Sequence, residues 1–361
     1  MKKMVKLMAM AAAVFTLTAC GGSGNEAQEA PNEASTPENV SVEENAEAPS
    51  GEETEAATEE NKETVDLNVA YMPNYASLWH LVTAVDKGFF EEEGLNVTLT
   101  EFADGPSEIA AMEGGSVDIA YIGHGAHKLA IEGNANIIVP SSVHNTDKIT
   151  VLPDSGIEKI EDIKGKKIAY TAGSSSETAL TSALSKAGLT MEDIDPYEMD
   201  ATNMVAAMMS GSVDACTAWN PYDSQILENV EGSKQIEFAT DSVNLSSFIA
   251  LPKYVEENRD IVLRFSRAIY KAMEFSSKEE NWDYAVGLYA KQTAKDKEAS
   301  MVETSDATWF SAEDVKTGIE DGTMKEYYEK QQKMFIDSGD VAEERPVEEY
   351  VEFDLMKEAL E

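Results

Sequence analysis

A nine-residue pattern that occurs twice is the strongest constraint on how this chain folds. Ala110–Asp118 reads Ala-Ala-Met-Glu-Gly-Gly-Ser-Val-Asp, and Ala206–Asp214, 96 positions later, reads Ala-Ala-Met-Met-Ser-Gly-Ser-Val-Asp. Each copy looks like the end of a helix, a glycine turn and the start of a strand. Two shorter matches precede it in the same order: Val69–Tyr71 with Ile168–Tyr170, and Gly94–Leu95 with Gly188–Leu189. Repetition at nearly constant spacing predicts two similar structural units.

Within each unit, short apolar runs alternate with segments of helical periodicity. In the first unit we expect strands at residues 66–72, 96–102 and 118–123, and helices at 78–90 and 107–112. In the second we expect a strand at 166–172 and a helix at 175–187. This alternation predicts an α/β fold with parallel strands and crossover helices. Ligands bind beyond the carboxyl ends of such strands, so two facing units would form a cleft that a hinge closes.

The first twenty residues predict export. Lys2 and Lys3 precede an apolar stretch that ends in Leu17-Thr-Ala-Cys20. We therefore predict a signal peptide at residues 1–19, because the stretch is shorter than the roughly 20 residues that a membrane span needs. A Cys after Leu-x-Ala resembles the lipobox of bacterial lipoproteins. That resemblance implies that Cys20 carries acyl chains such as palmitate and is the protein's only membrane contact, although an ordinary secretion signal is the alternative.

Residues 20–65 form an acidic segment with no aromatic side chain. Such a composition predicts a disordered linker that acts as a spacer, with a partner-binding tail as the alternative. The whole chain has a formal net charge of −40, which argues against nucleic acid and anionic membrane surfaces as partners. Besides Cys20 the only cysteine is Cys216, which we expect to be a buried thiol, so no disulfide framework is possible if Cys20 is acylated.

Four segments together carry a resemblance to one family. They are Lys87–Val97 (KGFFEEEGLNV), Ile163–Ala169, Gly173–Ser175 and Val213–Tyr222. These segments resemble solute-binding proteins of ABC transporters for aliphatic sulfonates, taurine, nitrate and thiamine-precursor pyrimidines. The resemblance implies a periplasmic-binding-protein-like (type II) fold, with lobe one at residues 66–150 plus 246–361 and lobe two at 151–245. It also implies an extracytoplasmic, lipid-anchored monomer at the outer face of the cytoplasmic membrane, without a cofactor or enzymatic activity, that delivers a solute to a permease.

Four predicted turns, at residues 72–77, 123–127, 172–176 and 219–222, supply most of the expected ligand contacts; Tyr71 and Trp79 flank the first turn and Ser246 lies at the predicted second crossing between the lobes. Gly173 and the serines 174–176 precede a helix, where backbone N–H groups and the helix dipole suit an oxyanion, although one serine could simply cap the helix. Trp219 is expected to stack on the ligand. The full set of expected contacts is Tyr71, Trp79, Gly123, His124, Gly173, Ser174, Ser175, Ser176, Trp219, Asn220 and Ser246.

Some residues near the predicted turns fit more than one role. Tyr71 and Trp79 fit a core role as well as a cleft wall, and His127 is expected to face outward or cap a helix. No metal site is expected, because neither a Cys nor a nearby carboxylate completes a ligand set with His124 and His127. For the ligand we expect an organosulfonate first, a pyrimidine or other small heterocycle second, and nitrate third. The four turns contain no Arg or Lys, which argues against a strongly charged anion. A ligand-sensing lipoprotein without a transporter is an alternative function.

Overall fold

A computed structural model describes the chain from residue 64 to residue 361. The predicted signal peptide, Cys20 and the predicted linker up to residue 63 lie outside the described residues. In the described part, no helix combines the length and the apolar character that crossing a bilayer requires.

The first repeat unit forms a parallel three-stranded arrangement with helices between the strands. β1 (Val65–Tyr71) lies between β2 (Leu95–Glu101) and β3 (Ile119–Ile122), and α1 (Tyr75–Asp86), α2 (Phe89–Glu92) and α3 (Gly105–Glu113) connect them. The helix predicted at 78–90 is thus two helices, because Gly88 has a φ of 74° and ends the first. α1 begins three residues earlier than predicted, since the Asn74 side chain accepts a hydrogen bond from the Ser77 N–H.

The second repeat unit has the same plan. β5 (Lys167–Tyr170) pairs in parallel with β6 (Asp195–Glu198) and β7 (Ala215–Cys216), and α5 (Ser175–Ala187), α6 (Ala201–Ser210) and α7 (Tyr222–Asn229) accompany them. β7 stops at Cys216, where its pairing with β5 ends, so Trp219 lies three residues beyond the strand.

The repeated Asp residues make equivalent hydrogen bonds in the two units. Asp118 Oδ2 accepts a bond from the Asn68 N–H at 2.8 Å, and Asp214 Oδ2 accepts one from the Lys167 N–H at 2.8 Å. Each Asp directly precedes its own strand and therefore ties the beginning of that strand to the neighbouring parallel strand. The predicted structural repeat is confirmed at the level of single bonds.

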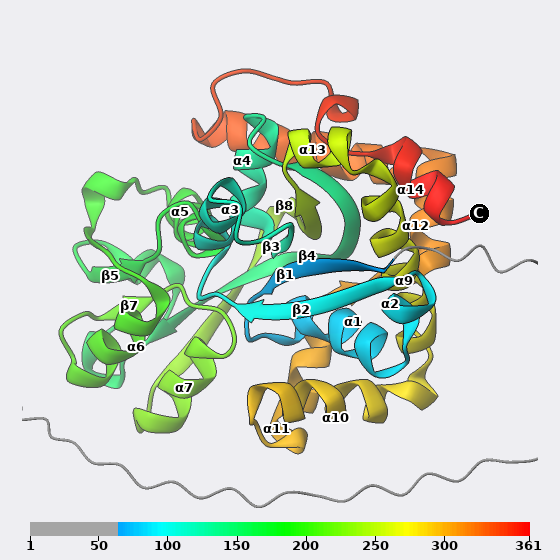
Figure 1. Ribbon diagram of the computed structural model, residues 1–361. Coiled ribbons are helices and arrows are strands. Elements are labelled where there is room, and N and C mark those ends of the chain that lie inside the picture. Colours follow the sequence, from blue (N-terminus) through cyan, green and yellow to red (C-terminus); the bar gives the residue numbers. More distant parts are fainter. Residues whose placement is uncertain (1–63) are drawn as a thin grey trace, which may run out of the picture. The chain divides into compact units, whose positions relative to one another are not determined.

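Two long antiparallel strands, β4 (Asn136–Val151) and β8 (Lys234–Ala250), join the units into one sheet (Figure 1). The strand order is β2-β1-β3-β8-β4-β7-β5-β6, and the short β9 (Thr308–Trp309) pairs with β4. The register of the β4–β8 pair shifts between Ile137 and Val139, between Pro140 and Ser142, and between His144 and Thr146. The predicted lobe boundaries, at 150/151 and 245/246, fall within these two strands.

The buried apolar side chains define two lobes. Lobe one surrounds a core cluster whose members lie between residues 67 and 139 and between 245 and 359, whereas the two clusters of lobe two lie between 149 and 238. α8 (Pro252–Glu257) is followed directly by α9 (Arg259–Ser276), and the apolar side chains of both helices are buried in lobe one. The remaining helices are α4 (His127–Ile131), α10 (Trp282–Thr293), α11 (Lys297–Val302), α12 (Ala312–Asp321), α13 (Thr323–Ser338) and α14 (Phe353–Ala359).

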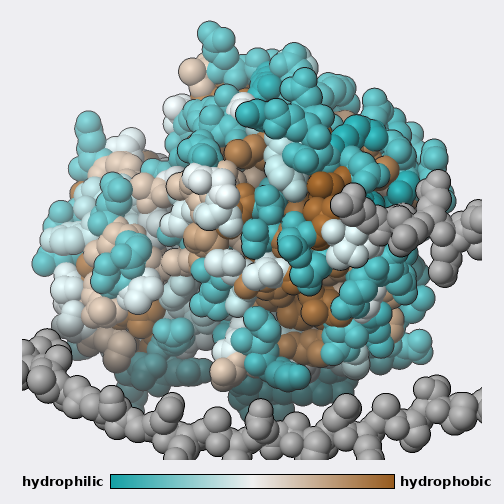
Figure 2. Space-filling model, in the orientation of Figure 1, coloured by the Kyte–Doolittle hydropathy of each residue, from teal (hydrophilic) through white to brown (hydrophobic). Residues whose placement is uncertain are grey.

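The face of the molecule drawn in Figure 2 is mostly hydrophilic, with smaller hydrophobic areas between the polar residues. This surface fits the strongly acidic composition of the chain.

Candidate functional site

A cavity of about 320 Å³ lies between the lobes and is the candidate site. Eight of the eleven predicted ligand contacts line it: Gly123, His124, Ser174, Ser175, Ser176, Trp219, Asn220 and Ser246. They come from the ends of strands and starts of helices in both lobes and from β8. The cleft thus lies where the carboxyl ends of the two sets of parallel strands face each other.

The other three predicted residues are not among the lining residues. Tyr71 donates a hydrogen bond to Glu101 at 3.2 Å, and Trp79 is buried behind Tyr75, with the two rings stacked at 5.3 Å. The Gly173 N–H donates to Glu177 at 2.9 Å. Tyr75 therefore occupies the wall position that we considered for Trp79. It belongs to the predicted turn 72–77, so its place in that turn was the signal available in the sequence.

Aromatic rings from both lobes form the apolar part of the cleft. Tyr75 and Trp309 lie edge to face, with ring centroids 5.3 Å apart, and Trp219 lines the cavity from lobe two. Trp309 is held in place by the hydrogen bond that its Nε1–H donates to the Thr304 carbonyl at 2.6 Å. Sequence reasoning missed Trp309 because it lies far beyond the segments that resemble the family.

The serines at the start of α5 are engaged within the protein. Ser174 caps the helix by accepting a bond from the Ser176 N–H at 3.1 Å, as the capping alternative predicted. Ser176 Oγ accepts a bond from the Thr171 N–H at 3.0 Å and lies 3.0 Å from the Thr217 hydroxyl. Ser175 Oγ accepts a bond from the Gly125 N–H of lobe one at 3.3 Å. These hydroxyls thus support the cleft walls and join the lobes.

The two lobes touch on both sides of the cavity. On one side, Lys128 of α4 forms an ion pair with Glu177 of α5, at 2.7 Å. On the other, Asn220 Nδ2 donates a hydrogen bond to Asp306 at 2.9 Å. Gly125 packs against α5 so closely that an added Cβ would lie 2.2 Å from the Ser174 carbonyl oxygen. The structure therefore shows a closed cleft.

Acidic groups outnumber basic ones in the cleft lining. Asp147, Glu237, Glu303 and Asp306 line it together with one lysine, Lys148. Lys148 Nζ lies 3.6 Å from both Asp223 and Asp306, and these two carboxylates outweigh the effect of burial and raise the pKa of Lys148. Burial raises the pKa of Asp147 to about 7. Lys148 was missed in the sequence because it lies on the crossing strand β4, outside the four predicted turns.

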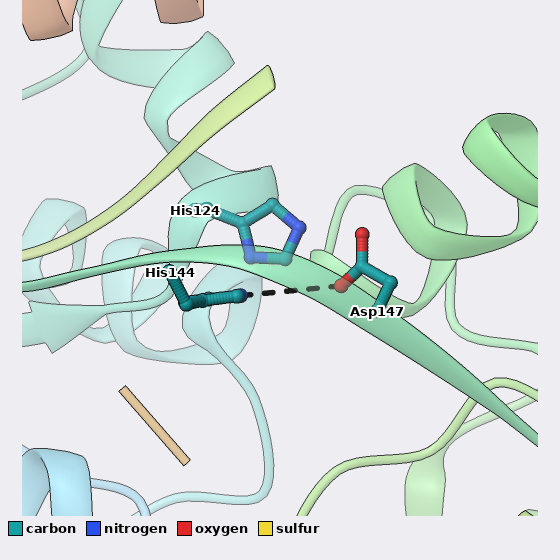
Figure 3. Close-up of side chains that lie close together, drawn as sticks. All are labelled: His124, His144 and Asp147. Carbon is teal, nitrogen blue, oxygen red and sulfur yellow. Dashed lines mark ion pairs between the residues drawn. The ribbon is translucent and has the colours of Figure 1, made fainter. Parts of the chain in front are cut away.

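Two histidines and an aspartate meet in the cleft wall (Figure 3). His124, from the turn after β3, faces His144 of β4 with ring centroids 5.2 Å apart, and His144 Nε2 lies 3.9 Å from Asp147 Oδ1. The Nε2 atom of His124 is buried without a hydrogen-bond partner. Burial lowers the pKa of His124 well below its usual value and that of His144 to about 4, so both rings are uncharged at neutral pH.

The expectation for His127 is wrong. Its ring is fully buried, with Nε2 3.1 Å from Ser247 Oγ and Nδ1 3.3 Å from the His124 carbonyl. The ring therefore ties the turn after β3 to β8, because α4 packs inward at this point. Cys216 is buried as expected, and burial raises the pKa of its thiol above the usual range.

Comparison with known proteins places these features in a family. The model of the family described as NMT1/THI5 like matches residues 76–280. A putative binding protein of Brucella abortus (strain 2308) is 30% identical over 281 residues, covering 77% of this chain and 87% of the relative. A putative aliphatic sulfonates-binding protein of Bacillus subtilis (strain 168) is 29% identical over 240 residues, covering 63% and 70%.

The fold also matches solved structures. The alkanesulfonate-binding protein SsuA from Xanthomonas axonopodis pv. citri, bound to MOPS, aligns with a TM-score of 0.61 and 21% identity, over 80% of this chain and 98% of that one. At this level of identity the likeness concerns the fold. The chain therefore belongs to the NMT1/THI5-like family and has the periplasmic-binding-protein fold.

Proposed function

We propose that this chain is the solute-binding component of an ABC importer, which captures a small molecule between its lobes and presents it to a permease. The observation that carries the proposal is a cavity of about 320 Å³ with walls from both lobes. A solute that contacts both walls binds the closed form better than the open one and so shifts the population toward closure. The permease then distinguishes loaded from empty protein by the closed shape.

The cleft chemistry favours a small aromatic heterocycle without a negative charge, such as a thiamine-precursor pyrimidine. Tyr75, Trp219 and Trp309 offer ring faces and edges for a planar molecule. Four carboxylates line the cleft; Glu303 is paired with Lys295 and burial raises the pKa of Asp147, which leaves Glu237 and Asp306 to act against an anion. The one lysine among the lining residues is already paired with Asp223 and Asp306. This assignment exchanges the first two solutes in the order that we expected from the sequence, so that the heterocycle comes before the organosulfonate.

An aliphatic sulfonate is the second candidate. The relative from Bacillus subtilis carries that ligand in its name, and Lys148 is the cation in the cleft that a sulfonate would have to recruit. Binding of a sulfonate would then require Lys148 to exchange one of its carboxylate partners for the ligand.

Calorimetric titration of the purified chain with an aminopyrimidine, an alkanesulfonate and nitrate distinguishes the candidates. We expect the pyrimidine to bind and the Lys148→Met variant to retain that binding. Sulfonate binding that disappears in Lys148→Met would favour the second candidate. If none of the three binds, and deletion of the chain's gene leaves uptake of all three unchanged, the importer role itself is wrong.

The proposed location is the outer face of the cytoplasmic membrane, through acylated Cys20. The support for this part lies in the sequence, since Cys20 is outside the described residues. A Cys20→Ala variant is expected to leave the membrane fraction on cell fractionation. If it stays with the membrane after a high-salt wash, the protein is anchored by another route.

A further inference from the structure

Three potential metal ligands converge in the cleft wall. One donor atom each from His124, His144 and Asp147 lies within 4.8 Å of the other two (Figure 3). Four-coordinate zinc has bonds of about 2.0 Å, which places its ligand atoms about 3.3 Å apart. The three side chains therefore have to move inward by about 1.5 Å at most, a shift that torsion changes at the ends of three side chains supply.

The buried imidazole of His124 needs a partner. His124 is only 3% exposed, and its Nε2 atom has no hydrogen-bond partner. A buried polar nitrogen without a partner is costly, and in native proteins such atoms call for an explanation. In Figure 3 the ring lies beside His144 and Asp147, so one of its two nitrogens is available to an ion among the three.

The surroundings of Asp147 fit a metal ligand. Its Oδ2 accepts a hydrogen bond from Asn244 Nδ2 at 3.3 Å, which leaves Oδ1 directed at His144. Such a bond to the outer oxygen orients a ligating carboxylate. The ammonium group of the neighbouring Lys148 lies 3.6 Å from Asp223 and from Asp306.

We propose that His124, His144 and Asp147 bind one divalent transition-metal ion, with zinc as the best chemical match. Two imidazole nitrogens and one carboxylate oxygen are the ligand types that zinc prefers, whereas magnesium and calcium prefer oxygen ligands alone. All three residues line the cavity, so the fourth coordination position faces it and is open to water or to a nitrogen or oxygen atom of a bound molecule. The site does not depend on the importer role, because it requires the ion alone.

Cobalt and zinc test the site directly. The full chain is treated with a chelator and then titrated with Co²⁺ in excess Mg²⁺, which occupies the surface carboxylates. We expect one Co²⁺ per chain, with the intense visible absorption of a four-coordinate ion, and its displacement by one equivalent of Zn²⁺. Absence of the absorption, or binding that Mg²⁺ abolishes, overturns the proposal.

Matched variants locate the ion. His144→Ala and Asp147→Asn are expected to weaken Zn²⁺ binding at least about 100-fold, because loss of an outer-shell group alone costs about 10- to 100-fold. Asp154→Asn makes the same change at an exposed position of lobe two and is expected to bind as the parent does. Circular dichroism checks that each variant is folded, and Asp147→Asn preserves the shape of the side chain. Equal affinity in all four proteins would assign the ion to another place and overturn the proposal.

Discussion

Lys128 Nζ of lobe one lies 2.7 Å from Glu177 Oε2 of lobe two, so an ion pair spans the mouth of the cleft. Both side chains are largely shielded from solvent, with 16% and 23% exposure. The pair exists only when the lobes are closed, and its free energy therefore counts toward closure and toward solute affinity.

Loss of this ion pair is expected to weaken solute binding modestly. Glu177→Gln removes the charge and should lower affinity about 2- to 5-fold, since pairs of this kind contribute roughly 0.5–1 kcal/mol. Calorimetric titration with the solute that binds in the experiment proposed above measures the change. Glu161→Gln breaks a pair with Lys159 inside lobe two and serves as the control. An equal loss in the control would mean that the spanning pair has no special part in closure.

A methyl group at Gly125 is expected to block closure. In Gly125→Ala the new Cβ would lie 2.2 Å from the Ser174 carbonyl oxygen, which is backbone of the opposite lobe and cannot move aside cheaply. We expect at least about a 10-fold loss of solute affinity. X-ray scattering should show a larger radius of gyration with solute present, while the thermal midpoint changes little.

The control for this variant is Gly287→Ala, where a Cβ would meet only the flexible Lys297 side chain at 3.7 Å. It is expected to close normally. A Gly125→Ala protein that binds solute and compacts as the parent does would show that the closed contact is not needed for binding.

Trp219→Ala is expected to weaken binding with little loss of fold stability. The ring lines the cavity and is only partly buried, so its main loss is the surface that it offers to the solute. We expect about a 10-fold drop in affinity, or about 1.4 kcal/mol. Trp282→Ala, at an exposed tryptophan of α10, is the control. A large drop in the melting temperature with unchanged affinity would instead assign Trp219 to the core.

The stability of the fold should fall as pH rises above the carboxyl range, because of Glu108. Its carboxyl group is fully buried without hydrogen-bond partners, and burial, with a smaller effect of Asp104, raises its pKa well above the usual range. The folded state keeps the proton at pH values where the unfolded state has lost it. Each pH unit in that window costs about 1.4 kcal/mol of unfolding free energy.

Glu108→Gln removes this titration, so its unfolding free energy should vary less between pH 5 and pH 8 than that of the parent. Denaturant unfolding at several pH values measures the difference. Glu113→Gln, at an exposed position of the same helix, should keep the parent's slope. Parallel curves for the parent and Glu108→Gln would mean that Glu108 is already ionised in the folded protein.

The repeat units were predictable because their signals are local. Apolar periodicity and glycine turns mark β1, α5 and the start of β3 within a few residues of their observed positions. The repeated Asp118 and Asp214 were visible in the sequence, although their bonds to neighbouring strands were not.

The course of the two crossing strands, and the cleft residues that they carry, could not be predicted from the sequence, and the reason is physical. β4 and β8 mix polar and apolar residues, since their side chains face a cleft on one side and a core on the other. His144, Asp147 and Lys148 therefore look like ordinary polar residues in the sequence. Trp309 reaches the cleft only because β9 pairs with Ser142 and Val143, a contact between distant segments.

The crossing strands also determine what kind of motion the molecule permits. A shear motion of the two lobes would break the hydrogen bonds between β4 and β8. Hinge bending at the bulges, in contrast, leaves these hydrogen bonds in place. His144 lies at such a bulge, and Asp147 follows it closely on the same strand. Any change in the opening angle therefore re-aims both side chains relative to His124. A ligand that binds His124, His144 and Asp147 together would restrain this bending. The affinity of that ligand would therefore depend on the angle between the lobes.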